Sequence, residues 1–384
     1  MCLLPLQGIR VVSIEHAVAA PFASRQLADL GAEIIKIEKP GVGDFARSYD
    51  EATHGLSGNF VWLNRGKKSV ELDLKKQENV QLIFDILQDT DVLLNNLGPG
   101  ALDRLGFNPE KLHEIFPHLI ICSISGYGKE GPYSNKKAYD LLIQSEAAVL
   151  QITGSPDAPA KTGLAVVDIA SGMYAFSSIL AAIIHRNKTK IGTIIEISML
   201  EAIAEWMSFP IYYTYGGTEP VRSGTDHATI YPYGPFLTMN KEQLFIAIQN
   251  NREWEIFCRE ILKDASLIVN PRFKTNILRV QNKMLLKKII EDVTGEIDRA
   301  DLANLLDEKK IANAYFNDIN GLINHPQLQF YQKWKNVNSE VGKISMLQSP
   351  MNFNNISCHW GDIPLLGEHT DEVLSPYKKR RSNY

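Results

Sequence analysis

One acidic side chain, Asp168, stands in an otherwise apolar stretch, GLAVVDIASG at positions 163–172. No lysine, arginine or histidine lies within several positions of it on either side. An ionised carboxylate in such surroundings costs several kcal/mol of free energy unless something holds it charged. A helix-like run from Met173 to Ala182 follows, and the free N–H groups at a helix start favour an anion. Asp168 is therefore either the cap of that helix, a common role for aspartate, or a reactive carboxylate.

The segments before Asp168 alternate between strand and helix patterns. We expect strands at 9–14, 33–38, 91–94 and 119–124, and helices at 21–30, 78–87 and 109–116. Alternation of this kind predicts an α/β fold in which a parallel sheet is covered by helices on both faces.

The turn after the first strand, EHAVAAP at 15–21, contains no glycine. A dinucleotide site needs Gly-x-Gly-x-x-Gly at this point so that the backbone can approach a pyrophosphate. Glu38, at the end of the second strand, could imitate the ribose-binding acid of a dehydrogenase. Without the glycines, the sheet is Rossmann-like but is not expected to bind NAD.

The second half of the chain has a different texture. Residues from about 216 to 234 are rich in Gly, Tyr, Pro and Thr, which indicates a connector. FLTM at 236–239 and QLFIAI at 243–248 predict the strands of a hairpin, and charge-rich helical sequence follows. This pattern predicts a smaller, separate domain. The tail from Val341 is predicted to be irregular, and the basic end at 378–381 to be a frayed, solvated terminus.

The bulk properties exclude several classes of partner. The 384 residues are 45% hydrophobic and 22% charged, with a net charge of −4. The chain as a whole therefore has no electrostatic attraction to nucleic acid or to an acidic membrane. The scattered cysteines, Cys2, Cys122, Cys258 and Cys358, argue against a zinc site and a disulfide framework. The apolar start lacks a basic n-region, and the longest apolar runs are too short to span a bilayer. We expect a cytoplasmic protein with no metal and no tightly bound cofactor.

Five segments of the chain form a pattern together. They are DLGAEIIKIEKPG at 29–41, NRGKKS at 64–69, GPGALDRLG at 98–106, SISGYG at 123–128 with KAYD at 137–140, and PLLGEHT at 364–370. In order and spacing they resemble the class III CoA-transferase family, also called CaiB/BaiF, from about residue 6 to residue 375. In that family the catalytic group is the aspartate of an Asp-x-x-x-Gly segment that opens a helix. The resemblance therefore implies that Asp168, in DIASG at 168–172, is the nucleophile.

The resemblance also implies an architecture and a mechanism. It places the first part of a Rossmann-like large domain at 1–200, a connector at 201–225, a small α+β domain at 226–330 and a return segment at 331–384 that completes the large domain. Two such chains would form an interlocked homodimer. Attack of the carboxylate on an acyl-CoA gives a mixed anhydride and CoA thiolate, and re-attack gives an aspartyl-CoA thioester.

CoA carries a pyrophosphate and a 3′-phosphate, so cations must converge on it. The resemblance implies that the CoA-binding residues are Lys39, Leu72, Lys75, Asn96, Arg104, Lys137 and Tyr139. Lys67 and Lys68 are further candidates for binding the CoA phosphates, and the alternative is that NRGKK forms a hairpin turn.

Two other activities compete with transfer. Racemases of the same family pair the aspartate with a histidine at the position of Tyr139, and a tyrosine with a pKa near 10 is a poor proton acceptor. His16 is the nearest rival base, but it lies in another segment. A non-catalytic CoA-binding subunit is disfavoured by the intact Asp168, Gly172 and Arg104. A CoA-transferase is the preferred interpretation.

The acceptor acid is predicted by analogy alone. Val18 replaces a glutamine of the formyl-CoA branch, and the connector at 224–234 is short, so formate and oxalate are disfavoured. We expect a substrate pocket made by His16, Val18, Asp140, His227, Tyr231 and Tyr233. Transfer from succinyl-CoA to a small dicarboxylate such as itaconate, mesaconate, citramalate or glutarate is the expectation. Candidates for reading the distal carboxylate are Arg47, Arg65 and Arg222.

Overall fold

The structure, a computed structural model, describes residues 4–356 and 358–382; Cys2 lies outside them. The chain divides into two compact units. Unit 1 comprises Met1–Val149, Thr162–Tyr212 and Phe330–Tyr384, and unit 2 comprises Leu150–Lys161 and Tyr213–Gln329. Unit 1 therefore contains both chain ends, whereas unit 2 includes Leu150–Lys161, which the sequence assigned to the large domain.

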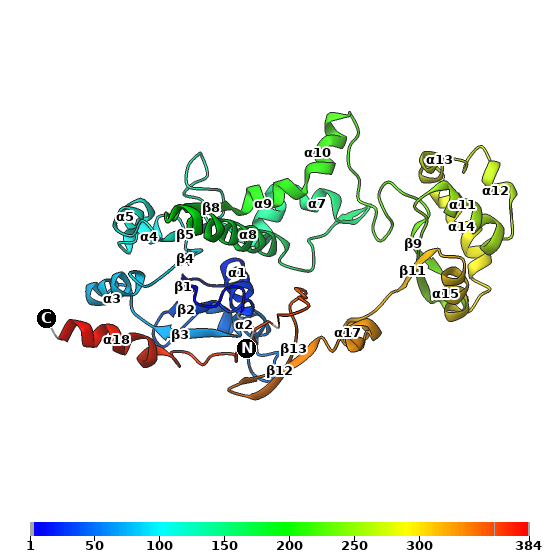
Figure 1. The fold of residues 1–384 in the computed structure, drawn as a ribbon. Coiled ribbons are helices and arrows are strands. Elements are labelled where there is room, and N and C mark those ends of the chain that lie inside the picture. The colour runs from blue at the N-terminus through cyan, green and yellow to red at the C-terminus, as the bar shows by residue number, and fades with distance from the viewer. Residues whose placement is uncertain (1–3, 357, 383–384) are drawn as a thin grey trace. The chain divides into compact units, whose positions relative to one another are not determined.

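Six parallel strands form the sheet of unit 1, in the order β3-β2-β1-β4-β5-β8 (Figure 1). Their bounds are β1 Arg10–Ile14, β2 Glu33–Glu38, β3 Lys67–Glu71, β4 Val92–Asn95, β5 Ile120–Ser125 and β8 Ile194–Ser198. Val11 pairs with both Ile34 and Val92, so β1 lies between β2 and β4. The strand order reverses between β1 and β4, and open α/β sheets bind ligands at this point, beyond the carboxyl ends of the strands. The predicted α/β fold with a parallel sheet is confirmed.

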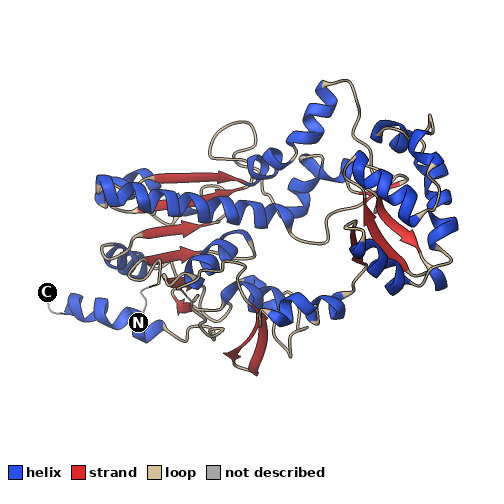
Figure 2. Ribbon diagram, turned by 45° about the vertical axis from the view of Figure 1, so that its right-hand side comes forward, coloured by secondary structure: helices blue, strands red, loops and turns tan. Residues whose placement is uncertain are grey.

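Helices cover both faces of this sheet (Figure 2). On one face, α3 Gln77–Leu87, α5 Pro109–Ile115 and α18 Thr370–Ser382 share a core with Val12 and Ile14 of β1. On the other face, α1 Ala19–Asp29 packs along α8 Val166–Thr189, and α8 also contacts β5 and β8. Val11 and Val12 are both fully buried although they point to opposite faces, which explains the continuous apolar strand sequences.

The predicted helices at 21–30, 78–87 and 109–116 are α1, α3 and α5, with ends within two residues of the prediction. The hairpin-turn alternative for NRGKK is wrong, because Lys67 and Lys68 pair with Ile34 and Ile35 in the parallel sheet. Shorter helices of unit 1 are η1 Phe45–Ser48, α2 Gly58–Asn64, α4 Ala101–Arg104, α6 Asp140–Glu146 and α9 Met199–Trp206.

Among the described residues, α8 is the one helix whose length and composition would allow it to cross a membrane. Half of its most apolar stretch is buried inside the protein.

Unit 2 has an antiparallel sheet in the order β11-β10-β9, with β9 Tyr233–Leu237, β10 Gln243–Ala247 and β11 Ala312–Tyr315. The predicted hairpin is therefore confirmed, with a first strand that begins and ends earlier than expected. Its helices include α11 Asn251–Ile256, α12 Ser266–Val269, α13 Asn276–Gln281, α14 Lys283–Thr294 and α15 Arg299–Glu308. They enclose a core around Trp254, Phe257 and Leu286. Other short elements are α7 Val149–Ile152, β6 Gly154–Ser155, β7 Ala158–Pro159, α10 Ser208–Tyr215, α16 Ile319–Ile323 and α17 Pro326–Phe330.

The tail is more regular than its sequence predicted. β12 Trp334–Ser339 and β13 Gly342–Leu347 form a hairpin, because Ile344 and Met346 alternate with polar residues and pack against Phe60. The basic end at 378–381 continues α18, and exposed Arg380 pairs with Asp89.

Candidate active site

The site lies where the strand order reverses. His16 follows β1 and Asn96 follows β4, and the two residues are joined across this point. The backbone N–H of His16 donates to Asn96 Oδ1 (3.0 Å), and Asn96 Nδ2 donates to the carbonyl oxygen of His16 (2.8 Å). Asn96 therefore holds the turn that carries His16, and its side-chain polar groups are used for this purpose.

A cavity of about 490 Å³ opens beside this turn. Four of the predicted residues line it, namely His16, Lys39, Leu72 and Lys75. Lys39 and Lys75 are exposed, whereas Leu72 is buried in the wall. A cavity of this size with an apolar wall and cations at its mouth suits a large anionic ligand.

The remaining predicted CoA-binding residues do not belong to the described lining of this cavity. Arg104 lies exposed on α4, and its Nη1 donates to the carbonyl oxygen of Pro99 (3.2 Å). Lys137 is exposed in the segment before α6, and Tyr139 precedes that helix with 63% of its surface exposed.

Asp168 lies in the first turn of α8, and Ala165 is the N-cap residue. The interpretation of Asp168 as a cap is therefore wrong. Asp140, the first residue of α6, performs the capping instead, because its Oδ1 accepts hydrogen bonds from the backbone N–H groups of Val167 (2.8 Å) and Asp168 (3.3 Å). The N–H groups of Val166 and Ile169 bond to nearby carbonyl oxygens.

This arrangement overturns the expectation that free N–H groups at the helix start hold Asp168 ionised. All four N–H groups from Val166 to Ile169 are engaged elsewhere. Burial raises the pKa of Asp168 to about 7, and the negative charge of Asp140 adds to the rise. A carboxyl group with a pKa near 7 is present at neutral pH in both its protonated form and its ionised, nucleophilic form.

Three aromatic rings form a row that begins at the cavity. The His16 ring lies 4.6 Å from the Phe45 ring, and the Phe45 ring lies 5.7 Å from the Tyr49 ring. Burial, followed by the charges of Asp44 and Asp168, raises the pKa of Tyr49 to about 12, so its hydroxyl stays protonated. Tyr49 was not identified from the sequence, because it lies in a loop segment far from Asp168 along the chain.

Gly172 sets how closely α8 approaches the β1–α1 turn. A Cβ at this position would lie 2.6 Å from the carbonyl oxygen of Ala19 and 3.1 Å from the Phe22 ring. Only glycine permits this contact, which places Asp168, one helical turn earlier, beside the turn. Val18 is buried in a hydrophobic cluster with Phe22, and Ile169 of α8 packs against this cluster. Val18 therefore supports the packing of α8 and does not line an open pocket.

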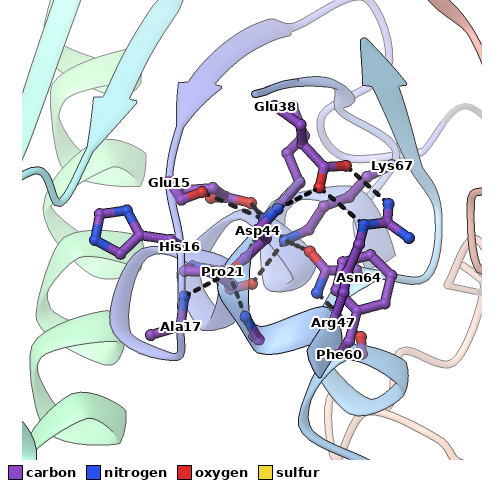
Figure 3. A network of polar contacts seen from close by, with 12 residues as sticks. Glu15, His16, Ala17, Pro21, Glu38, Asp44, Arg47, Phe60, Asn64 and Lys67 are labelled. Carbon is purple, nitrogen blue, oxygen red and sulfur yellow. Dashed lines mark hydrogen bonds and ion pairs between the residues drawn. The ribbon is translucent and has the colours of Figure 1, made fainter. Parts of the chain in front are cut away.

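A network of buried charges (Figure 3) adjoins the cavity, and Glu15, Glu38 and Asp44 belong to both. Glu15 accepts hydrogen bonds from Lys67 (2.7 Å) and Ser24 (2.7 Å), and Asp44 accepts one from Lys36 (2.7 Å). Burial lowers the pKa of Lys67 to about 7, against the opposing charge of Glu15. In Figure 3 the Glu15, Asp44 and Lys67 side chains converge, and the His16 ring points away from them.

Residues 6–370 match the sequence profile of CoA-transferase family III. The chain belongs to this family. It is 33% identical over 375 residues to the succinyl-CoA:glutarate CoA-transferase of Mus musculus, covering 96% of this chain and 86% of that protein. It is 32% identical over 388 residues to the succinate–glutarate CoA-transferase of Agrobacterium fabrum, covering 97% and 95%. The solved structure of a CaiB/BaiF family protein from Brucella suis is similar, with a TM-score of 0.86, 29% identity and coverage of 98% and 100%.

Membership of this family makes the chain an enzyme of the CoA-transferase type, whose substrates are CoA thioesters. Among the described residues of this CoA-transferase, no group of three or more His, Cys, Asp or Glu side chains is arranged to hold a metal ion.

The predicted pocket residues from the small domain lie in unit 2. The prediction that Tyr231 lines the substrate pocket is wrong, because its ring belongs to the hydrophobic core and only 1% of its surface is exposed. His227 stacks on Tyr233 with ring centroids 4.9 Å apart, and its Nδ1 accepts hydrogen bonds from the backbone N–H groups of Thr229 and Ile230.

The three candidate arginines of this CoA-transferase are all engaged within the protein. Arg47 pairs with Glu38 (2.8 Å). Burial alone would raise the pKa of Glu38, but the hydrogen bond from Arg47 and the charge of Lys36 lower it to about 2. Arg65 pairs with buried Asp29 (2.7 Å). Arg222 donates to carbonyl oxygens of its own unit, including that of Ser155 (2.9 Å).

Proposed function

We propose that this enzyme transfers CoA from succinyl-CoA to a small dicarboxylic acid through covalent intermediates on Asp168. The observation that carries this proposal is the buried carboxyl group of Asp168, whose pKa is raised to about 7 and whose charge acts on Tyr49. The Tyr49 ring follows those of Phe45 and His16, and His16 lines a cavity that is also lined by two lysines. The names of the relatives support the choice of substrates, since two of them act between succinyl-CoA, or succinate, and glutarate.

The transfer can be written so that every bond is accounted for. The Asp168 carboxylate oxygen attacks the thioester carbonyl carbon, the C–S bond breaks, and a mixed anhydride and CoA thiolate form. The thiolate then attacks the carbonyl carbon of Asp168, which releases succinate and leaves an aspartyl-CoA thioester. An acceptor carboxylate attacks that thioester, and the returning thiolate takes the acceptor acyl group from the second anhydride. The Asp168 carboxylate is regenerated, and no net proton is consumed.

Tyr49 is the donor that we assign to the tetrahedral oxyanions. The helix-start N–H groups are engaged, whereas the Tyr49 hydroxyl remains protonated because its pKa is raised to about 12. Tyr49 is also 47% exposed, so a bound acyl group can reach it. A hydrogen bond aimed at the developing negative charge stabilises the transition state more than the ground state.

Lys39, Leu72 and Lys75 line the cavity that we assign to the nucleotide end of CoA. Arg104 and Lys137 are exposed and have long, flexible side chains, and we propose that these side chains approach the phosphates when CoA is bound.

The test is a screen of acids with succinyl-CoA as donor, in which new acyl-CoA masses are detected. We expect glutarate, itaconate, mesaconate or citramalate to give a product and Asp168→Ala to give none while CoA still binds. Product formation by Asp168→Ala would contradict the covalent mechanism. A racemase would instead move deuterium from solvent into the α-position of a branched acyl-CoA, so this exchange is measured in parallel.

We also propose that the enzyme is a cytoplasmic homodimer of interlocked chains. Apolar side chains near Asp168 are exposed in the single chain: Leu141 (46%), Leu142 (51%) and Met173 (39%) lie on α6 and α8 of unit 1. Apolar surface of this kind around a catalytic helix suits burial by a second copy. Light scattering should give twice the chain mass of 43.1 kDa, and a monomer mass would contradict the proposal.

A further inference from the structure

We propose that Asp44 is a positioning residue for CoA transfer: its carboxylate holds, at the same time, the two backbone segments that border the reacting acid. This inference rests on the function proposed above. Asp44 follows β2, and only 3% of its surface is exposed.

The two carboxylate oxygens have separate tasks. Oδ1 accepts hydrogen bonds from the backbone N–H groups of Ala17 (3.1 Å) and Ala46 (2.9 Å). Oδ2 accepts a hydrogen bond from Lys36 Nζ (2.7 Å). Because both oxygens are used within the protein, Asp44 acts through its neighbours.

The first bond fixes the turn after β1. Ala17 has a φ of 61°, a left-handed conformation that is strained for a non-glycine residue. Strain of this kind persists only where the surroundings hold it, and the hydrogen bond to Asp44 does so. Ala17 and Val18 pack against Ala165 and Ile169, at the start of the helix that carries Asp168.

The second bond fixes the ring sequence. Asp44 is the N-cap residue of η1, and its bond to Ala46 N–H determines where this short helix begins. Phe45 and Tyr49 lie in and directly after η1, so their rings depend on the same carboxylate. One side chain therefore holds both the turn that packs against the start of α8 and the short helix that positions Tyr49.

Lys36 in turn fixes the carboxylate of Asp44. It is fully buried on β2, and its Nζ also lies 3.5 Å from Glu15 Oε1. Glu15 pairs with the fully buried Lys67 of β3, so two cations balance two carboxylates beside the cavity (Figure 3). A buried charge network of this kind adds little stability in comparison with an apolar core, but it defines one geometry.

The test compares two substitutions of Asp44. Asp44→Ala removes both backbone bonds, and we expect the kcat of CoA transfer from succinyl-CoA to fall roughly 30- to 100-fold, because small misplacements of reacting groups have effects of this size. The KM for succinyl-CoA should change by less than about threefold, since Lys39 and Lys75 are untouched. Asp44→Asn keeps an oxygen for the N–H groups of Ala17 and Ala46, and Lys36 keeps Glu15 as a counterion at 3.5 Å, so kcat should recover to within about fivefold of the parent.

Lys36→Met supplies a second route if Asp44→Ala does not fold. It leaves the Asp44 carboxylate buried without its cation, so kcat should fall, and adding Asp44→Asn should raise kcat again because the charge is then removed. Lys309→Met is the control. It removes a partly exposed lysine of unit 2 that pairs with Glu260 and Glu308 and has no role assigned in the site, and kcat should not change.

The outcomes separate this inference from the proposed function. Suppose that the parent transfers CoA. If folded Asp44→Ala keeps the parent kcat, or if the kcat of Asp44→Asn is no higher than that of Asp44→Ala, the positioning role of Asp44 is overturned while the proposed function stands. If Asp44→Asn fails to improve Lys36→Met, the role assigned to the ion pair is overturned. A parent that transfers no CoA to any acid contradicts the proposed function, and this inference with it.

Discussion

At the scale of the residue, the mechanism proposed above makes the reaction depend on the protonation of Asp168. Burial and the charge of Asp140 raise its pKa to about 7, and only the ionised carboxylate attacks a thioester. We expect kcat/KM for succinyl-CoA to rise with pH through about 7 and then level off. Asp140→Asn keeps an oxygen for the N–H of Val167 but removes the charge, so the rise should move to lower pH. A pH–rate profile with the rise unchanged would rule out this role of Asp140.

The same pKa has a consequence for stability. The pKa of Asp168 is about 7 in the folded state and 3.8 in the absence of burial, so the folded state binds more protons between these values. The free energy of unfolding contributed by this group therefore falls as the pH rises from about 4 to about 7. Asp168→Asn should be more stable than the parent at pH 8 by roughly 1–4 kcal/mol and similar to it at pH 4. Denaturant unfolding at the two pH values measures this difference, and an equal gain at both would contradict it.

Tyr49 provides an independent check on the assignment of the oxyanion donor. Tyr49→Phe keeps the ring that lies 5.7 Å from Phe45 and removes only the hydroxyl. We expect kcat to fall roughly 10- to 100-fold with little change in KM, as when one oxyanion donor is lost. Steady-state kinetics with succinyl-CoA and glutarate supply the measurement. An unchanged kcat would assign the donor role to another group.

At the scale of the element, the packing of α8 on α1 brings Asp168 to the β1–α1 turn. Gly172→Ala places a methyl group 2.6 Å from the carbonyl oxygen of Ala19, so the helices must separate. We expect a loss of roughly 1–3 kcal/mol in stability together with reduced kcat. Gly163→Ala is the control, because a Cβ there has no described heavy atom within 4 Å. Thermal unfolding and kinetics of both variants test this prediction, and equal behaviour of the two would contradict it.

The elements differ in how well local sequence predicted them. The four predicted strands are buried on both faces, so their apolar runs are visible in the sequence. β3 was not predicted, because it includes Lys67 and Lys68, and the charge of Lys67 is balanced by Glu15, which follows β1. The start of α8 was misplaced for a similar reason, since its capping carboxylate belongs to Asp140, 28 residues away.

At the scale of the whole molecule, distant segments of unit 1 are joined by buried ion pairs. Arg65 donates two hydrogen bonds to Asp29 at the end of α1 (3.1 and 2.7 Å), and its guanidinium lies 4.4 Å from the Trp360 ring in the C-terminal segment. Arg65→Met should therefore lower stability by about 2–4 kcal/mol and leave the KM for the acceptor acid within about twofold. Unfolding and kinetic measurements distinguish this structural role from recognition of a distal carboxylate. A large change in acceptor KM without loss of stability would support recognition.

By itself, the sequence determined the parallel α/β sheet, the family and the aspartate of its Asp-x-x-x-Gly segment, because these depend on apolar periodicity and on short motifs. It also placed Lys39, Leu72 and Lys75 together, and they share one cavity. Only the tertiary structure decided that Asp140 caps α8, that the charge of Asp168 acts on Tyr49 and that Asp44 accepts a hydrogen bond from the turn at Ala17. These contacts join residues from separate elements, and their energies depend on burial and on neighbouring charge, which exist only after the chain has folded.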